Sequence, residues 1–168
     1  GGRVAVYVTD SSDFDAFTSA GGVISAYGSR TTVVGTLPQS SCGTVYLEGA
    51  DGTKRIVIDN DGGNCNCYTD FPVPVERGGD DPKLYKDVTV VLRNKGAINV
   101  VGEVMVGEVE IETDNSKYPS FFLNDHDFVI RSWEHKRGKG WATWKADAGT
   151  EGKGRVVWEP PGMMLFVR

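Results

Sequence analysis

The chain is built from short runs in which apolar and polar residues alternate, and this pattern constrains its fold more than any other feature. The first run, residues 3–8, places valine at every second position, which is typical of a strand with one buried face. The 22 glycines, together with Asp and Pro, separate such runs at short intervals. The sequence therefore predicts an all-β fold of many short strands joined by tight turns.

One pair of runs has a clear turn between its members. Asp51 and Gly52 lie between residues 45–48 and residues 54–58, and a turn of this composition favours an antiparallel hairpin. The other runs that we expect to form strands are 31–37, 43–47, 88–92, 97–101, 127–132, 141–145, 155–158 and 163–167.

The run over residues 103–112 changes the parity of its apolar residues midway. This change predicts a β-bulge at Gly107–Glu108, which would bend the strand as sandwiches and barrels require. We therefore expect an antiparallel, jelly-roll-like β-sandwich over residues 1–115. Residues 116–168 hold all four tryptophans and are expected to form a small β-rich extension or projection.

Bulk properties narrow the classes of partner. The net charge of −5 and the pI near 5.0 argue against a nucleic-acid footprint over the whole surface. No apolar run approaches the roughly 18 residues that a membrane span needs, so no membrane partner is expected. The chain begins with Gly1 and Gly2 rather than Met, which is typical of a processed product.

The three cysteines, Cys42, Cys65 and Cys67, are an odd number, so at least one is unpaired within the chain. A bridge from Cys42 to Cys65 or Cys67 in an oxidising compartment and a set of ordinary thiols both stay open. A zinc site is not expected, because Cys65 and Cys67 lack a second ligand pair at finger-like spacing.

A tight acidic cluster follows the first strand. Asp10, Asp13 and Asp15 lie within six residues, with serines between them. Carboxylates this close repel one another, so either water solvates them separately or a hard cation such as Ca²⁺ neutralises them. The loop 59–70 superficially matches the spacing of a helix-loop-helix calcium motif, but Asn64 stands where that motif has glycine.

Signals for an enzyme are weak. The sequence has no nucleophile elbow, no Walker loop and no H-E-x-x-H motif. Asp125, His126 and Asp127 have the composition of an acid–base pair, but a solvated turn explains them better. Paired carboxylates on strands keep a glycan-processing enzyme as a third alternative. We therefore expect a protein that is not an enzyme.

Aromatic and basic residues are interleaved between residues 131 and 145. Trp141 and Trp144, flanked by Lys139 and Lys145, could stack on sugar rings or bases while the lysines meet anionic groups. Core packing of at least one of the two tryptophans is the competing interpretation, and it is favoured.

Three sequence stretches resemble a known family. They are VAVYVTDSSD, DDPKLY followed by VTVVL, and NVVGEVMVGEVEIE. In this order they are similar to the second half of the jelly-roll shell domain in coat proteins of small icosahedral RNA viruses of the sobemovirus and tombusvirus kind. The opening strands and the basic RNA-binding arm of that family are absent here.

The resemblance implies a capsid protein of a virion that self-assembles through β-sandwich contacts. Asp10 and Asp13 match the D-x-x-D motif of the family, which implies a Ca²⁺ site at a subunit contact. Its partners would be copies of itself, other capsid chains, RNA, or a second fragment that completes the sandwich. The alternative function is a secreted carbohydrate-binding module or lectin that binds glycan through Trp141 or Trp144 and takes calcium near Asp10 or Asp59.

Overall fold

The computed structural model describes residues 2–9, 14–28, 41–61, 68–71, 84–112, 119–132 and 137–159. No helix within these ranges is long and apolar enough to cross a membrane. The predicted strands at 31–37 and 163–167 lie outside them.

The helical elements are α1 (Phe14–Ser19) and the 3-10 helix η1 (Lys139–Ala142). The strands are β1 (Arg3–Tyr7), β2 (Thr44–Glu48), β3 (Lys54–Asp59), β4 (Thr69–Phe71), β5 (Val88–Arg93), β6 (Ile98–Val100), β7 (Val104–Val106), β8 (Glu108–Ile111), β9 (Phe121–Phe122), β10 (Asp127–Ile130), β11 (Ala146–Asp147) and β12 (Arg155–Trp158).

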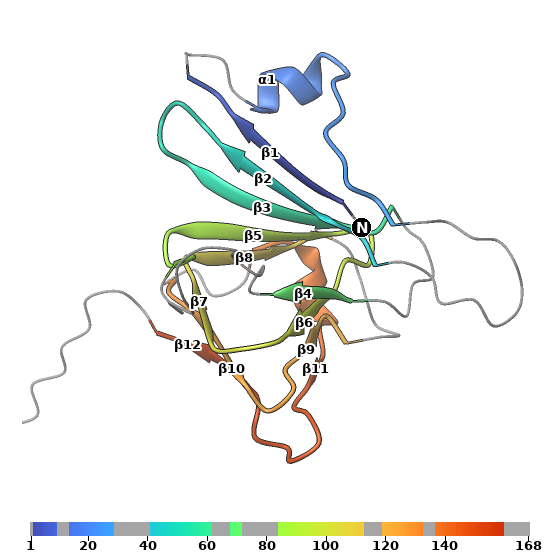
Figure 1. Cartoon of the computed structure of the whole chain (residues 1–168), viewed down its shortest axis with the longest axis vertical. Helices are drawn as coiled ribbons and strands as arrows, with labels where there is room; N and C mark the ends of the chain where they lie inside the picture. Colours follow the sequence, from blue (N-terminus) through green and yellow to red (C-terminus); the bar gives the residue numbers. More distant parts are fainter. Residues whose placement is uncertain are drawn as a thin grey trace, which may run out of the picture.

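The strands form three sheets, and the chain visits these sheets in a repeating order. The first sheet holds β1, β2, β3, β5 and β8, the second holds β4, β6, β9 and β11, and the third holds β7, β10 and β12. From β5 the chain passes through β6 and β7 and returns to the first sheet at β8; β9 and β10 then follow. Each pass is one coil of a three-sided solenoid whose faces are the three sheets (Figure 1).

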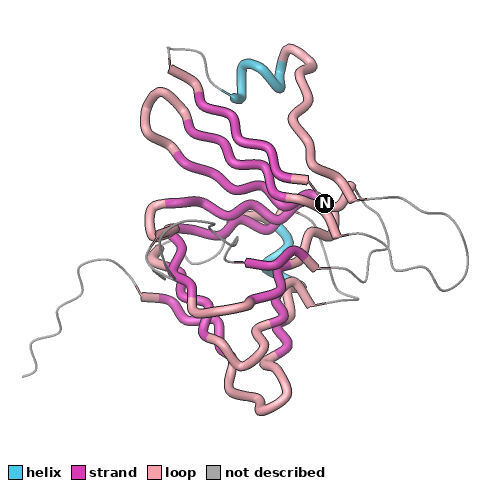
Figure 2. Tube along the Cα trace, in the orientation of Figure 1, coloured by secondary structure: helices cyan, strands magenta, loops and turns pink. Residues whose placement is uncertain are grey.

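The antiparallel jelly-roll sandwich predicted from the sequence is wrong. Every strand pair among the described residues is parallel except that of β2 with β3. Most strands pair with a strand one coil earlier or later, so they stack along the solenoid axis (Figure 2). Alternation misled the prediction because it shows which side chains are buried, and it is the same for parallel and antiparallel neighbours.

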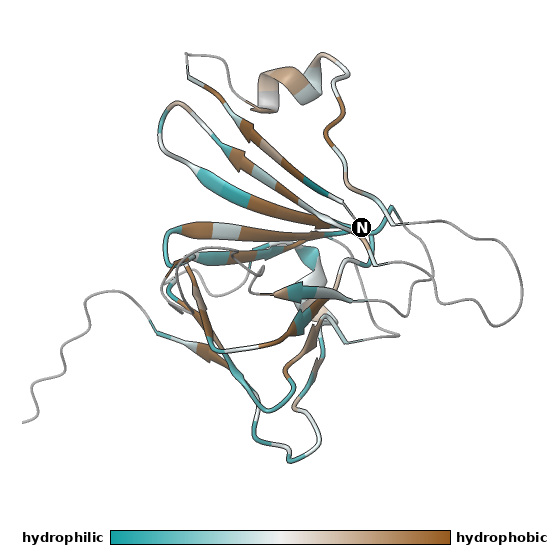
Figure 3. Ribbon diagram, viewed as in Figure 1, coloured by the Kyte–Doolittle hydropathy of each residue, from teal (hydrophilic) through white to brown (hydrophobic). Residues whose placement is uncertain are grey.

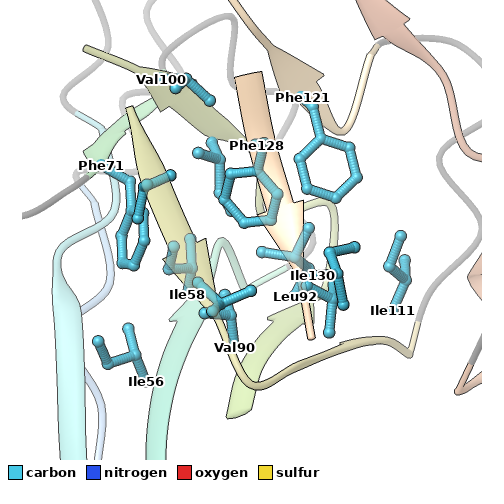
Figure 4. Packing of buried hydrophobic residues seen from close by; sticks show 14 of the residues in the cluster. Ile56, Ile58, Phe71, Val90, Leu92, Val100, Ile111, Phe121, Phe128 and Ile130 are labelled. Carbon is cyan, nitrogen blue, oxygen red and sulfur yellow. The ribbon is translucent and has the colours of Figure 1, made fainter. Parts of the chain in front are cut away.

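Side chains at equivalent positions of successive coils stack inside the solenoid. On the first face Ile56, Val90 and Val109 are in register, and on the third face Val104 is in register with Phe128. All five are buried, and Figure 4 shows side chains from different faces meeting in one interior. Burial of such a side chain contributes about 1.5–3 kcal/mol relative to exposure, so these stacks are the main source of stability.

The parity change in residues 103–112 marks a corner and not the predicted bulge. β7 lies on the third face, β8 lies on the first face, and Gly107 alone separates them. A Cβ at Gly107 would lie 3.0 Å from the carbonyl oxygen of Lys86, so glycine allows this close approach to the preceding coil. Both halves of the run still bury their apolar residues, because the inward direction changes at the corner.

The predicted hairpin between β2 and β3 is confirmed, with Val45 opposite Val57. The Asp51 carboxylate shapes its turn by accepting hydrogen bonds from the backbone N–H of Thr53 (2.8 Å) and from the Thr53 hydroxyl (2.8 Å). These hydrogen bonds lower the pKa of Asp51. β1 then extends the first face by pairing in parallel with β2.

The outer side of the first face carries a second, smaller core. Val45, Val57 and Val91 are buried there, and Ile24 and Ala26 pack against them. These two residues belong to the segment after α1, which is anchored by a hydrogen bond from the Gly43 N–H to the Ala26 carbonyl (2.6 Å). The N-terminal part of the chain therefore covers this side of the sheet.

The C-terminal coil closes the other end of the interior with aromatic rings. Trp141, Trp144 and Trp158 contact one another with ring centroids 5.1–6.0 Å apart. The predicted boundary at 115/116 lies outside the described residues, but β9 to β12 beyond it continue the second and third faces. The predicted strand at 141–145 is instead the 3-10 helix η1 and the turn after it.

Candidate functional site

A row of polar and aromatic side chains runs along the outside of the second face. The register of its strands aligns Asp70 with Asn99, Asn99 with Phe122, and Phe122 with Asp147. These positions point outward because the alternate positions, such as Phe71, are buried in the core. The row therefore crosses all four strands of this face.

Hydrogen bonds join the polar members of this row into a ladder. The Asn99 amide donates to Asp70 Oδ1 at 2.7 Å, and the Asn124 amide donates to Asn99 Oδ1 at 2.7 Å. Asn124 is held in turn by its second contact, with the carbonyl of Val100 at 2.9 Å. Both N–H groups of the Asn124 amide are used by these two bonds, whereas the Asn99 amide donates only one of its two to Asp70. The second Asn99 N–H and the remaining lone pairs of the Asp70 carboxylate therefore give the ladder capacity for a ligand.

An aromatic pair lies beside the ladder. The rings of Tyr68 and Phe122 have centroids 3.5 Å apart and planes inclined at 34°. Tyr68 shares the outward parity of Asp70, and Phe122 is the register partner of Asn99. Both rings are half-buried, so they present apolar surface next to carboxylate and amide groups.

A small cavity opens at the Asp70 end of the row. It measures about 140 Å³ and is lined by Gly2, Arg3, Ser41, Cys42, Gly43, Thr44, Thr69 and Asp70. This volume is below the roughly 300–1,000 Å³ of pockets that enclose a drug-sized ligand. The cavity therefore suits a small substituent of a ligand whose larger part lies on the open face of the sheet.

Cys42 is one of the residues that line this cavity. Its thiol is buried, with Sγ 3.2 Å from Thr69 Oγ1, and the Thr69 hydroxyl donates to the Cys42 carbonyl at 2.9 Å. These contacts tie the start of β2 to β4. Cys65 and Cys67 lie outside the described residues, so the predicted alternatives for disulfide pairing stay open.

The predicted calcium ligands Asp10 and Asp13 also lie outside the described residues, and the Ca²⁺ site stays a prediction. The side chain of Asp59 accepts hydrogen bonds from the Asp61 N–H (2.8 Å) and the Asn94 amide (3.0 Å). In the part of the chain that the structure describes, no group of three or more His, Cys, Asp or Glu side chains is arranged to hold a metal ion.

The predicted sugar-stacking tryptophans belong to the aromatic end of the core. Trp141 is 5% exposed, and its indole N–H donates to the carbonyl of Val109 at 3.4 Å. Trp144 is half-buried and contacts Phe121 edge-on, with ring centroids 5.8 Å apart. Lys139 and Lys145 are both exposed. The competing interpretation, core packing, is therefore confirmed for Trp141.

The segment 125–127 forms a turn and a strand start. The Asp125 carboxylate accepts the backbone N–H groups of Glu151 and Lys153 at 3.0 Å, and these bonds lower its pKa. Asp127 is paired with Arg155 through two hydrogen bonds of 3.2 and 2.6 Å. Both carboxylates therefore hold the C-terminal coil together.

Sequence reasoning missed the second-face row altogether. Its members are 20 to 30 residues apart in the chain, at about one per coil. Register partners on the first face are not equally far apart in the chain, because Lys54 pairs with Val88 whereas Thr89 pairs with the much nearer Glu108. The coils therefore differ in length. No fixed repeat therefore marks the row in the sequence.

No protein-family model matches the chain, and neither the curated proteins nor the solved structures contain a significant match.

Proposed function

We propose that the chain binds a carbohydrate along its second face. The observation that carries this proposal is the position of the Tyr68–Phe122 pair directly beside the Asp70–Asn99–Asn124 ladder. A sugar ring has an apolar face of C–H groups and a rim of hydroxyls. Aromatic rings match the first, and carboxylate and amide groups match the second.

The direction of the row favours a polymer over a single sugar. Neighbouring strands of a sheet lie about 4.8 Å apart, so a glycan that lies along the solenoid axis contacts one further strand for every strand spacing that it spans. Asp70 and Asp147 are at opposite ends of the row, which gives hydrogen-bond acceptors at both ends. The cavity next to Asp70 would take a substituent of the terminal sugar.

This proposal keeps the carbohydrate-binding alternative of the sequence analysis but moves its site. Trp141 lies in the core, so the aromatic platform becomes Tyr68 and Phe122. Capsid assembly stays a prediction from the resemblance, and the sandwich contacts on which it relied are replaced by a parallel solenoid.

Calorimetric titration with oligosaccharides tests the proposal. The probes are neutral β-glucan, xylan and mannan fragments and a polyuronate fragment. Phe122→Ala removes half of the aromatic pair and should weaken binding about tenfold, the equivalent of ~1.4 kcal/mol. Asn99→Ala breaks the ladder at its centre and should weaken binding of the same probe.

The matched control is Phe17→Ala, which removes an exposed aromatic ring (48% exposed) away from the second face. It should leave binding unchanged. Absence of binding to every probe, or equal losses in Phe122→Ala and Phe17→Ala, would contradict a site on this face.

A further inference from the structure

The small cavity at the Asp70 end of the second-face row has walls of definite chemistry. Thr44, the first residue of β2, and Thr69, the first residue of β4, line it together with Asp70. Figure 3 colours β4 partly hydrophilic and partly hydrophobic, as expected for a strand whose Asp70 is exposed and whose Phe71 is buried. The cavity therefore lies between the first and second faces and adjoins the row.

The two threonines differ in how their hydroxyl groups are used. The Thr69 hydroxyl donates to the Cys42 carbonyl at 2.9 Å. Thr44 is 7% exposed, and its hydroxyl has no hydrogen-bond partner in the described part of the chain. Buried polar groups are normally hydrogen-bonded, because an unpaired one costs free energy. The Thr44 hydroxyl is therefore a donor that a ligand in the cavity can satisfy.

The Thr44 hydroxyl is not sealed inside the protein. Among the described side chains, the unpaired polar atom that solvent does not reach is Ser120 Oγ. The oxygen of Thr44 thus contacts accessible space, and the cavity is the space that this residue lines. A group that enters the cavity can therefore reach this hydroxyl.

Asp70 adds an acceptor to the same cavity. Its Oδ1 accepts one hydrogen bond, from the Asn99 amide at 2.7 Å. A carboxylate has about four lone-pair sites, so most of its capacity is unused by this bond. The cavity therefore offers one hydroxyl donor and one carboxylate acceptor to a substituent that carries both kinds of group.

The size of the cavity narrows the choice of substituent. Its volume is about 140 Å³. A protein cavity of about 150 Å³ holds a molecule as large as benzene. A hydroxymethyl group, with two non-hydrogen atoms, would leave most of such a space empty. An acetamido group is twice as large, and it has an N–H donor, a carbonyl acceptor and a methyl group.

Charge excludes two other common substituents of sugars. A carboxylate or a sulfate would lie beside the Asp70 carboxylate, and like charges at this distance repel. An ammonium group would be attracted to Asp70, but Cys42 and Gly43 are buried and give it no substitute for its lost hydration. An uncharged substituent with its own donor and acceptor fits the cavity best.

We propose that this cavity binds the acetamido group of an N-acetylated amino sugar. This assignment rests on the proposed carbohydrate binding along the second face and adds the chemical class of the sugar. The Thr44 hydroxyl donates to the acetamido carbonyl, the acetamido N–H donates to Asp70, and the methyl group packs against Cys42. The sugar ring then lies outside the cavity, next to the ladder.

Two tetrasaccharides with the same β-1,4 backbone, chitotetraose and cellotetraose, isolate the contribution of the acetamido group. Calorimetric titration of the 168-residue chain should give a Kd at least tenfold lower for chitotetraose. The deacetylated tetramer of glucosamine should bind more weakly than chitotetraose. Equal affinity for chitotetraose and cellotetraose, or tighter binding of the deacetylated tetramer, would overturn the proposal.

Two variants place the preference in the cavity. Thr44→Val keeps the shape of the side chain but removes the donor, and Asp70→Asn replaces one acceptor oxygen with an amide nitrogen. Each should bring the ratio of the two affinities close to one. Thr89→Val is the matched control, because Thr89 lies on β5 and contacts Glu108 at 3.5 Å; it should keep the full ratio. A preference that survives both Thr44→Val and Asp70→Asn would contradict this site.

The same titrations separate this proposal from the one on which it rests. If cellotetraose binds equally well and Phe122→Ala weakens its binding, the second face binds glycans but the acetamido assignment is wrong. If neither tetrasaccharide nor any other glycan probe binds, both proposals are wrong.

Discussion

The two ends of the solenoid are completed in different ways. At the C-terminal end Trp141, Trp144 and Trp158 close the core with aromatic rings. At the N-terminal end β2 and β1 extend the first face beyond the coils and leave Tyr7 exposed. Terminal repeats of a solenoid need a cap, because nothing stacks on their last coil. The C-terminal end is closed by a cluster of packed rings with Trp141 at its buried centre, whereas the N-terminal end is a sheet margin with exposed side chains.

The largest expected effect is the loss of the buried ring from the C-terminal cluster. Trp141→Ala should lower the free energy of unfolding by about 3–5 kcal/mol, because a 5% exposed ring leaves a cavity among its neighbours. Tyr7→Ala, at the other end, should change it by less than about 0.5 kcal/mol, because the ring is 63% exposed. Denaturant unfolding of both variants measures the difference. Equal losses in the free energy of unfolding would contradict the proposed difference between the two ends.

Glycine substitutions give a smaller contrast between the ends. Gly138 (φ +84°) precedes η1, and a Cβ there would lie 2.3 Å from the carbonyl oxygen of Ile111. Gly52 (φ +83°) in the β2–β3 turn has nothing within 4 Å of such a Cβ. Gly52→Ala should therefore cost about 1 kcal/mol from backbone strain alone. Gly138→Ala should cost about 3 kcal/mol, because steric overlap adds to the strain.

Thermal melting of the two glycine variants checks this prediction. The wild-type chain is the reference for both. A melting temperature that falls equally in the two variants would mean that the C-terminal coil moves away from Ile111 without cost.

The smallest effect concerns two turn carboxylates and their pH dependence. Backbone N–H donors lower the pKa of Asp125 at the C-terminal end and of Asp51 at the N-terminal end from 3.8. A carboxyl group with a lowered pKa stabilises the fold above its unfolded pKa, and this contribution is lost as the pH falls. The melting temperature of the wild-type chain should therefore drop on acidification through pH ~4.

Asn variants separate the two carboxylates. Asp125→Asn should flatten the pH dependence and lower the melting temperature at neutral pH more than Asp51→Asn. The reason is that Asp125 joins segments 26 residues apart, whereas Asp51 bonds within its own turn. Melting curves between pH 2 and pH 7 measure both, and a larger effect of Asp51→Asn would reverse the comparison.

Strand positions followed well from the alternation of residue types. The strand predicted at residues 54–58 corresponds to β3 (Lys54–Asp59), and the strand predicted at 88–92 corresponds to β5 (Val88–Arg93). The pairing of these strands did not follow, because β3 and β5 are separated by β4 and the residues around it and still lie side by side. Alternation is a property of one strand, whereas pairing depends on where the chain turns its corners.

The candidate site was foreseen only in its chemistry. An aromatic platform with polar neighbours was expected at Trp141 and Trp144, but η1 turns Trp141 into the core. The structure brings together Tyr68, the residue before β4, and Phe122 of β9, both on the second face. Their separation in the chain hides the contact, because coils of unequal length leave no spacing rule to connect them.

The sequence by itself determined which residues face inward, where the β2–β3 hairpin turns, and that the chain is made of strands. These are local properties, since alternation and turn composition act within a few residues. Only the tertiary structure decided that the strands are parallel, that Gly107 is a corner, and that Asp70, Asn99 and Asn124 form one ladder. Stacking of coils joins residues that are distant in the chain, and its free energy comes from the shared core of all three faces.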